Sequence, residues 1–284
     1  MQRLRIKHLT TYTFQSPVTL NPHKLLLRPR EGHDVRIESS RLDITPAHTI
    51  KWQRDVFDNS LAVVSFQQNA DKLTIASEVV IQHYGLAPFD FLIDDYAVNY
   101  PFTYALEEQI DLAPFQQLVF HHDRQVLNIW LQQFGLSGME TFGLLVKLNQ
   151  FISNQFRYQM RDEAGVQTPA QTLTNRSGSC RDYATLFIEA CRCLGFASRF
   201  VSGYLHAPST EAGHATTHAW AEIYLPGTGW KGFDPTSGVV TGSQHIAVAV
   251  ARSPEAVPPI AGSFTGTGQA APTMLVDVQV NLLT

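Results

Sequence analysis

The sequence is poor in charge, and neither sign dominates. Only 16% of its 284 residues are charged, and 21 Lys and Arg against 25 Asp and Glu leave a net charge of −4 with histidine neutral. Globular proteins carry about 25% charged residues on average. A mildly acidic chain without a run of Lys and Arg lacks the electrostatic footprint of a nucleic-acid-binding protein. We therefore expect no nucleic-acid partner.

Long apolar runs and frequent cysteines are also missing. No stretch approaches the roughly 18 apolar residues that a membrane-spanning helix requires. The basic start, residues 1–7, is followed by polar residues instead of the apolar segment of a signal peptide. Three cysteines are too few for a disulfide scaffold. These absences predict a globular protein of the cytoplasm with no membrane partner, and they leave the oligomeric state open.

The first hundred residues have the pattern of β-strands. Short segments alternate apolar and polar residues or are rich in β-branched and aromatic residues, and turn residues such as Asp58-Asn59-Ser60 separate them. These segments lie at residues 3–6, 12–14, 35–38, 41–44, 61–66 and 73–81. Several short strands at near-regular spacing predict an antiparallel β-sandwich. We assign it to a β-rich N-terminal domain over residues 1–100.

Beyond residue 100 the period of the apolar residues changes, and helices are expected together with strands. Apolar residues three and four apart predict helices, whereas a polar segment with Gly and Pro predicts a long loop. The expected elements are helices at 115–134 and 142–156, a loop at 161–179, a helix from Cys180 that ends at Gly195, and strands at 196–205, 217–225, 229–233 and 274–280. The pattern predicts an α+β fold, with a second domain over residues 101–284.

Cys180 stands where the third of these helices begins. The first-turn N–H groups of a helix have no partner within the helix, and the helix dipole is positive at this end. Both effects favour a thiolate, which is the form of cysteine that acts as a nucleophile. The same N–H groups can bind an oxyanion. The alternative interpretation is that Cys180 is a small buried apolar residue, as free cysteines often are.

A nucleophilic thiol needs a base, and the base needs an orienting group. His218 lies in a predicted strand, and Asp234 ends the next one, with Pro226-Gly227 between them as a hairpin turn. Adjacent antiparallel strands lie about 5 Å apart, which brings an imidazole and a carboxylate within reach. Taken alone, His218 could be a structural histidine and Asp234 a turn residue. The order Cys, His, Asp is more specific than any one of the three.

Four segments resemble the transglutaminase-like core, a papain-related cysteine-proteinase fold. They are GSCRDYA at 178–184, RFVSGYL at 199–205, HAWAEIY at 218–224 and GWKGFDPT at 229–236, and the resemblance covers about residues 142–238. Pro17-Val18 and residues 27–30 are similar, more weakly, to the β domain that precedes this core in bacterial members. The resemblance implies a catalytic domain over residues 101–284.

The resemblance also implies roles for the three residues. Cys180 would be the nucleophile, His218 the general base and acid, and Asp234 the residue that orients the imidazole. Members of the family catalyse amide acyl transfer or amide hydrolysis without a cofactor, and we expect a peptide or protein substrate. Hydrolysis of a peptide or isopeptide bond through a thioester is our first expectation because water is always available. The alternatives are a transamidase that passes the acyl group to an amine, and a catalytically silent binding or scaffold module.

Three more residues are candidates for supporting roles. Asp182 lies in the first turn of the helix that Cys180 begins, where a carboxylate caps the helix or pairs with Arg181 or Arg199. Trp220 and Glu222 share a strand face with His218 if the side chains alternate. Trp220 could instead be a core aromatic, and exposure to solvent is the simpler interpretation of Glu222.

A metal site is not expected. Cys191 and Cys193 can be combined with His214 and His218 into a zinc-ligand set. Residues two apart on a helix point about 200° apart, however, so the two thiols cannot reach one ion. The pattern GTGWKG at 227–232 precedes a strand end instead of a helix, which argues against a dinucleotide-binding loop.

Overall fold

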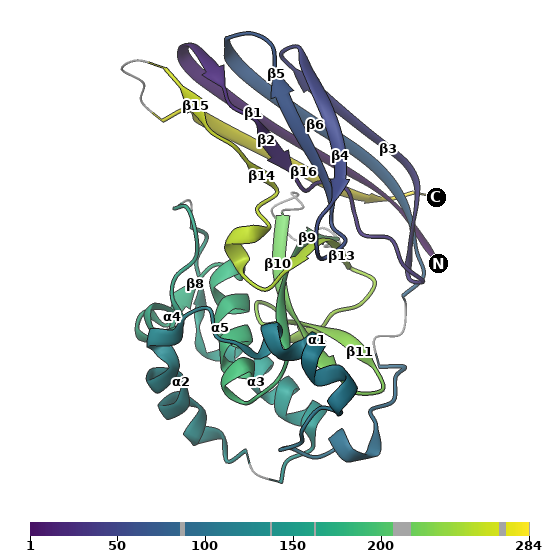
Figure 1. Cartoon of the computed structure of the whole chain (residues 1–284), viewed down its shortest axis with the longest axis vertical. Helices are drawn as coiled ribbons and strands as arrows, with labels where there is room; N and C mark the ends of the chain where they lie inside the picture. The colour runs from purple at the N-terminus through teal and green to yellow at the C-terminus, as the bar shows by residue number, and fades with distance from the viewer. Residues whose placement is uncertain (86–88, 137, 162, 207–216, 267–270, 284) are drawn as a thin grey trace.

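The computed structural model describes residues 1–85, 89–136, 138–161, 163–206, 217–266 and 271–283. The chain forms two lobes, which Figure 1 shows one above the other. The upper lobe, here the β lobe, consists of two antiparallel sheets. The lower lobe, here the α+β lobe, consists of a five-stranded sheet and the helices that pack beside it. The predicted fold class, a β-sandwich followed by a mixed domain, is confirmed.

The β lobe is built from long strands. One sheet has the order β15-β1-β6-β3, with β16 paired to β1, and the other has the order β14-β2-β5-β4. The strands are β1 (Gln2–Leu20), β2 (His23–Leu25), β3 (Val35–Thr45), β4 (His48–Arg54), β5 (Ser60–Phe66), β6 (Ala70–His83), β14 (Ile260–Ala261), β15 (Phe264–Thr265) and β16 (Thr273–Leu282). Some short strands predicted separately belong to one long strand. Segments 3–6 and 12–14 both lie in β1, and segments 35–38 and 41–44 both lie in β3.

The alternation seen in the sequence produces the sandwich core. Ile75 of β6 and Val64 of β5 are fully buried, and they belong to one apolar cluster between the two sheets. Leu20 of β1 and Leu25 of β2 lie in the same cluster. Because side chains alternate along a strand, one face of each sheet supplies this cluster while the other faces outward.

The α+β lobe has an antiparallel sheet of order β12-β11-β10-β9-β13. Its strands are β9 (Ser198–Leu205), β10 (Thr217–Leu225), β11 (Gly229–Asp234), β12 (Val239–Val240) and β13 (His245–Ala251), and β7 (Arg157–Tyr158) pairs with β8 (Ser177–Gly178) outside this sheet. The α-helices are α1 (Leu106–Gln116), α2 (Arg124–Leu131), α3 (Thr141–Gln155), α4 (Pro169–Asn175) and α5 (Cys180–Cys193). Helix α5 packs against β10 and β9, which makes it the central helix of the lobe.

Two further predicted elements differ from the structure. The helix expected over 115–134 is broken, because α1 ends at Gln116 and α2 begins at Arg124. The N–H groups of Val119 and Phe120 in the break donate to the buried Glu189 carboxylate instead of continuing a helix. The loop expected over 161–179 contains α4, whose N-terminus is capped by reciprocal hydrogen bonds between Thr168 and Gln171.

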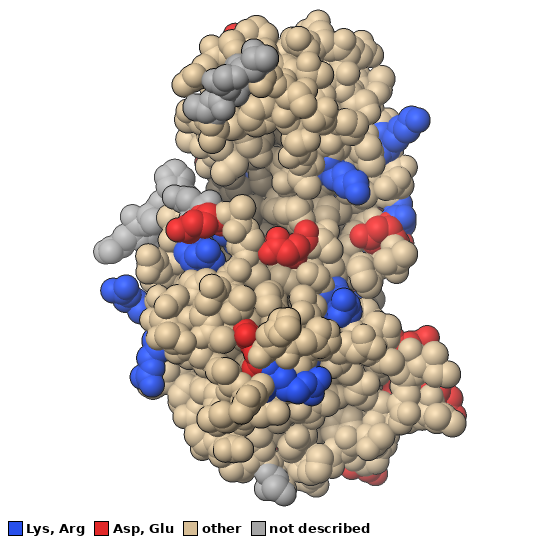
Figure 2. Space-filling model, turned by 60° about the vertical axis from the view of Figure 1, so that its left-hand side comes forward, with Lys and Arg blue, Asp and Glu red and all other residues tan. Residues whose placement is uncertain are grey.

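The two lobes share buried contacts. One apolar cluster includes Leu4 and Ile6 of β1 together with Tyr204 and Ile246 of the α+β lobe. His8 of β1 lies 3.1 Å from the Tyr204 hydroxyl, measured from Nδ1 to Oη. Figure 2 shows the molecule narrowing to a waist between the lobes, on a face where charged side chains are scattered.

The chain crosses between the lobes twice. After β13 it returns to the β lobe, where β16 pairs with β1 from Leu4 opposite Leu282 to Thr13 opposite Thr273. The division into residues 1–100 and 101–284 remains a prediction, but the pairing shows that the last strands of the second segment complete sheets of the first. Among the described helices, none is long and apolar enough to cross a membrane.

Candidate active site

Cys180 is the first residue of α5, as the sequence predicts, and its side chain is partly exposed. The carboxylate of Asp182 folds back over the helix start, where Oδ2 accepts hydrogen bonds from the N–H and the hydroxyl of Ser179 at 2.8 and 2.9 Å. This capping fixes the turn that carries the thiol. It also places the thiol at the positive end of a fourteen-residue helix.

Asp182 has a second role, which differs from the pairing considered in the sequence analysis. It is fully buried, and its Oδ1 atom accepts from Arg161 Nη1 at 2.8 Å and from the N–H of Gln167 at 2.7 Å. Its charge partner is therefore Arg161, and neither Arg181 nor Arg199 bonds to it. The carboxylate ties the segment before α4 to the start of α5, so it shapes the chain around Cys180.

His218 lies at the start of β10, opposite Gly203 of β9. Its side chain is 7% exposed. Only glycine fits at position 203, because the Trp220 ring fills the space where a side chain would begin. A Cβ atom there would lie 2.6 Å from Trp220 Cη2. Trp220 is itself 2% exposed, and its ring centroid lies 6.2 Å from that of His218. Trp220 therefore packs beside the imidazole within the core.

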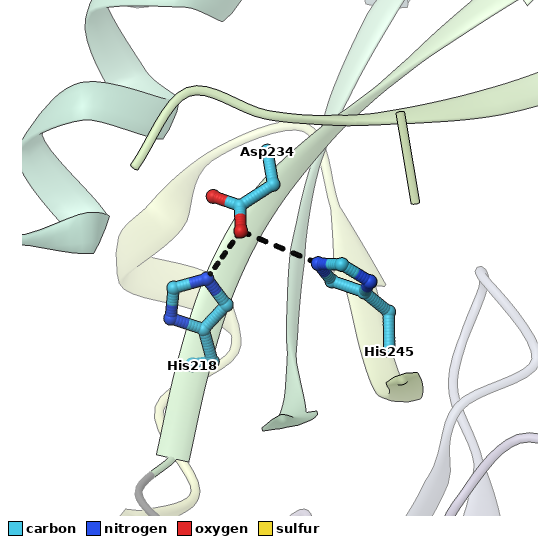
Figure 3. Close-up of side chains that lie close together, drawn as sticks. All are labelled: His218, Asp234 and His245. Atoms are coloured by element: carbon cyan, nitrogen blue, oxygen red, sulfur yellow. Dashed lines mark hydrogen bonds and ion pairs between the residues drawn. The ribbon is translucent and has the colours of Figure 1, made fainter. Parts of the chain in front are cut away.

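Asp234 ends β11, and its carboxylate meets the His218 ring. The Nε2 atom of His218 lies 3.0 Å from Asp234 Oδ2, as Figure 3 shows. The hairpin predicted between the two strands is present, with Ala221 opposite Phe233. The rest of the carboxylate is held by the chain that follows it, since the N–H of Thr236 donates to Oδ1 at 2.9 Å and the hydroxyl of Ser237 donates to Oδ2 at 2.8 Å.

The electrostatics of the pair favour charged forms of both groups. Burial disfavours the imidazolium, but hydrogen bonds with Asp234 and Cys180 outweigh it and raise the pKa of His218 to about 10. Burial likewise disfavours the carboxylate, but hydrogen bonds from His218 and His245 hold the pKa of Asp234 well below its usual range. Because Nε2 of His218 is hydrogen-bonded to Asp234, Nδ1 is the nitrogen available to Cys180. The structure thus brings Cys180, His218 and Asp234 together.

A second histidine, which the sequence analysis missed, shares the carboxylate. His245 begins β13, and its Nε2 atom lies 3.3 Å from Asp234 Oδ2, on the side away from His218 (Figure 3). Nothing in the spacing of the eleven histidines distinguishes it. His218, Asp234 and His245 have the donor types of a metal site, and their ligand atoms lie within 4.8 Å of one another. Asp234 Oδ2 is hydrogen-bonded to Nε2 of each histidine, so all three ligand atoms already have partners within the protein.

Tyr158 is another neighbour of the thiol. It ends β7, which runs parallel to β8 just before Cys180. Burial, together with the charge of Cys180 and a hydrogen bond to it, raises the pKa of Tyr158 to about 12. A hydroxyl that holds its proton this firmly is a hydrogen-bond donor at the sulfur throughout the neutral range.

Glu222 lies apart from the three central residues. It pairs with Arg199 at 2.6 Å, and the guanidinium of Arg199 covers the Trp230 ring at 4.1 Å. Glu222 is two register positions beyond Trp220 along β10, so it faces the same side as His218 but bonds elsewhere. Its interactions in the structure stabilise the sheet and do not reach the thiol.

The other two cysteines differ from Cys180 in their surroundings. Cys191 is fully buried in α5, and burial raises its pKa well above the usual value. Burial also raises the pKa of Cys193, to about 11. Both thiols therefore stay protonated near neutral pH. His214, considered with them as a zinc ligand, lies outside the described residues.

Comparisons with known proteins show relatives over the full length of the chain and over one short segment. The chain is 24% identical over 287 residues to an uncharacterized protein of Mycobacterium leprae, which covers 98% of this chain and 99% of that protein. A segment of 58 residues, 20% of this chain and 7% of the relative, is 36% identical to peptide-N(4)-(N-acetyl-beta-glucosaminyl)asparagine amidase of Rattus norvegicus. A crystal structure from Cytophaga hutchinsonii named "Putative Cysteine Protease" has the same fold, with a TM-score of 0.78 at 19% identity over 100% of this chain and 91% of that one.

Two family profiles match the chain in consecutive parts. Residues 4–82 match the bacterial transglutaminase-like N-terminal region, and residues 133–235 match the transglutaminase-like superfamily. The second match includes the start of α5 and the β10–β11 hairpin, which carry Cys180, His218 and Asp234. The chain is therefore similar to the transglutaminase-like superfamily over its core, and the bacterial transglutaminase-like N-terminal region matches ahead of that core.

Proposed function

We propose that the protein is a cysteine-dependent amide hydrolase that acts on peptide or isopeptide bonds through a thioester. The observation that carries this proposal is the placement of His218 between two partners, with Nε2 on Asp234 and the other ring nitrogen available to Cys180. An imidazolium held by a carboxylate on one side stabilises a thiolate on the other.

The first half of the reaction forms the thioester. The Cys180 sulfur forms a bond to the carbonyl carbon of the scissile amide, and an electron pair moves to the carbonyl oxygen. When the tetrahedral intermediate collapses, the C–N bond breaks and His218 gives the proton on Nδ1 to the departing amine. Asp234 keeps the imidazole in the orientation in which Nδ1 faces the sulfur.

The second half returns the enzyme to its starting state. His218, now neutral, takes a proton from water as the water oxygen forms a bond to the thioester carbon. The C–S bond breaks, which releases the carboxylic acid and restores the thiolate beside the imidazolium. In the transamidase alternative, an amine takes the place of this water and a new amide is released.

We propose two donors for the developing oxyanion. One is the backbone N–H of Cys180, in the first turn of α5, where N–H groups lack partners within the helix. The other is the hydroxyl of Tyr158, which lies beside the sulfur. Hydroxyl donors aimed at a developing charge typically contribute to the rate by stabilising the transition state.

Hydrolysis is favoured over transamidation by the local likeness to an amidase. The 58-residue segment shared with peptide-N(4)-(N-acetyl-beta-glucosaminyl)asparagine amidase is 36% identical, and that relative is named for amide hydrolysis. A catalytically silent scaffold is the alternative of a different class. A scaffold has no need for an imidazole with a strongly raised pKa beside a partly exposed thiol.

The proposal is tested by trapping the acyl-enzyme. The wild-type protein is mixed with p-nitrophenyl acetate, and intact-mass and peptide-mass spectrometry follow acetylation of each cysteine. We expect a burst of p-nitrophenol, with the acetyl group on Cys180 only. Cys180→Ala should abolish the burst, whereas Cys193→Ser, at the other partly exposed cysteine, should retain it. A burst that survives in Cys180→Ala would refute the proposed function.

A further inference from the structure

The Asp234 carboxylate is held by more donors than an orienting residue requires. Its Oδ2 atom accepts from His218 Nε2 at 3.0 Å, from the Ser237 hydroxyl at 2.8 Å and from His245 Nε2 at 3.3 Å. Oδ1 accepts from the N–H of Thr236 at 2.9 Å. Asp234 has no exposed surface. The orientation of the carboxylate is therefore set by protein groups on every side, and His245 holds the face opposite His218 (Figure 3).

The hydrogen bonds of His245 determine where its proton lies. The N–H of Gly242 points to Nδ1 at 3.4 Å, so Nδ1 is the acceptor nitrogen. Nε2 must then carry the hydrogen that it donates to Asp234. This describes a neutral imidazole with one defined tautomer. The two histidines on Asp234 thus differ at the other ring nitrogen, which accepts from Gly242 in His245 and is available to Cys180 in His218.

His245 is fixed from both lobes. At its backbone, the carbonyl oxygen lies 3.4 Å from His83 Nε2, at the end of β6 in the β lobe. Burial lowers the pKa of His83, which keeps it neutral as a donor. At its ring, Trp220 packs in a T-shaped arrangement with centroids 5.3 Å apart. The side chain is 5% exposed. These contacts leave the His245 ring little freedom to turn away from the carboxylate.

We propose that His245 is a positioning residue, which donates from Nε2 to Asp234 Oδ2 and thereby fixes the carboxylate in the orientation that holds the His218 imidazolium beside Cys180. The proposal rests on the proposed function, since it assigns how that site is kept in order. His245 touches neither the substrate nor the thiol in this scheme. It acts through Asp234, and the β lobe contributes to the site through His83.

The test follows the reactivity of Cys180 itself, so it needs no substrate. His245→Leu removes the donor, whereas His245→Gln retains an N–H that can reach the carboxylate. Peptide-mass spectrometry gives the rate of iodoacetamide alkylation at Cys180 at about pH 6 and about pH 9.5, where an ordinary thiol is largely protonated and largely ionised, respectively. His48→Leu, a change in β4 of the β lobe, serves as the control.

At about pH 6 we expect alkylation to fall about tenfold in His245→Leu, the scale of one lost hydrogen bond to a charged group, and two- to threefold at most in His245→Gln. At about pH 9.5 the variants should converge, because the thiol ionises there without help from His218. The charged and titratable groups around the site in this comparison are Cys180, His218, Asp234 and His83, together with Tyr158 beside the sulfur and the Asp182–Arg161 pair at the start of α5. A general loss of structure would lower the rate at both pH values and would not be rescued by Gln.

Several results would overturn the proposal. One is equal rates in wild type and His245→Leu, and another is an equal loss in the Leu and Gln variants. If His245→Leu does not fold, ¹⁵N NMR of the wild-type protein decides, because a charged or Nδ1-protonated His245 is incompatible with the proposal. Failure of the proposed function looks different: wild-type Cys180 would itself react no faster at about pH 6 than a cysteine in the unfolded chain.

Discussion

His218 and Asp234 face each other across one antiparallel hairpin, with Nε2 of the imidazole 3.0 Å from Oδ2 of the carboxylate. The strand register determines this contact, since β10 and β11 pair from Ala221 opposite Phe233 to Leu225 opposite Gly229. Cys180, the proposed nucleophile, comes from a different element, the start of α5, which packs on β10. The three groups therefore depend on the packing of one helix on one hairpin.

Asp234→Asn should reduce the rate of acyl transfer much less than loss of Cys180 does. An amide in this position can turn its NH₂ group toward His218, which disfavours the required tautomer, and the expected loss is about 10²–10⁴-fold. The initial acetylation rate with p-nitrophenyl acetate measures it, with circular dichroism as a check on the fold. An unchanged rate would mean that the carboxylate does not orient the imidazole.

His218 should titrate far above an ordinary histidine. Hydrogen bonds with Asp234 and Cys180 overcome the effect of burial and raise its pKa to about 10, so ¹H–¹⁵N NMR should show an imidazolium at neutral pH. Because the folded-state pKa exceeds the unfolded value, the contribution to stability is present below about pH 6.5 and is lost as the pH rises through about 10. In Asp234→Asn the midpoint should fall. A wild-type midpoint near 6.5 would contradict the ion pair.

Protonation of His8, which lies at the contact between the lobes, should lower the stability of the protein at acid pH. Burial lowers its pKa to about 4, and the ring is hydrogen-bonded to Tyr204 and Thr10. The unfolded chain therefore binds a proton that the folded protein does not between about pH 6.5 and 4. Stability should fall across this window by up to about 3 kcal/mol from this residue.

Urea unfolding of wild type and His8→Gln at several pH values tests this dependence. Glutamine can donate and accept hydrogen bonds but does not titrate near these pH values, so the variant should show a flatter profile. His48→Gln, elsewhere in the β lobe, should keep the wild-type slope. Identical slopes for wild type and His8→Gln would exclude His8 as the source.

Gly203→Ala should damage both stability and reactivity. A Cβ at this position would overlap the Ile246 carbonyl oxygen and lie 2.6 Å from Trp220 Cη2. Overpacking of this kind typically costs about 1–3 kcal/mol. Because Trp220 packs beside His218 and His245, alkylation of Cys180 should slow as well. Ser202→Ala, on the same strand, removes an atom instead of adding one and should leave both measurements close to wild type.

The placement of Cys180, His218 and Asp234, and most of the fold around them, could be predicted because the signals are local. Cys180 begins a helix after Ser177-Gly178-Ser179, and His218 and Asp234 sit in two strands joined by a short turn. The capping role of Asp182 follows from its place in the first helical turn. Thr168 followed by Gln171 is the sequence pattern of a helix N-terminal cap. It indicates the α4 helix within the segment for which we expected a loop.

The remaining contacts depend on residues far apart in the chain. Asp182 pairs with Arg161 across a polar segment, where the two nearer candidates were Arg181 and Arg199. The break between α1 and α2 depends on Glu189, seventy residues from Val119. His245 reaches Asp234 only because β13 joins the sheet beside β9. The two residues of each pair are too far apart in the sequence for a local pattern to predict their contact.

The return of β16 to β1 makes the polypeptide tolerant of a nick between the lobes. A protease that cut the first crossing, between β6 and α1, would produce two fragments that still share the β1–β16 ladder and the packed core at the waist. Such a protein would run as two bands on a denaturing gel yet elute as one particle, with Cys180 still facing its histidine.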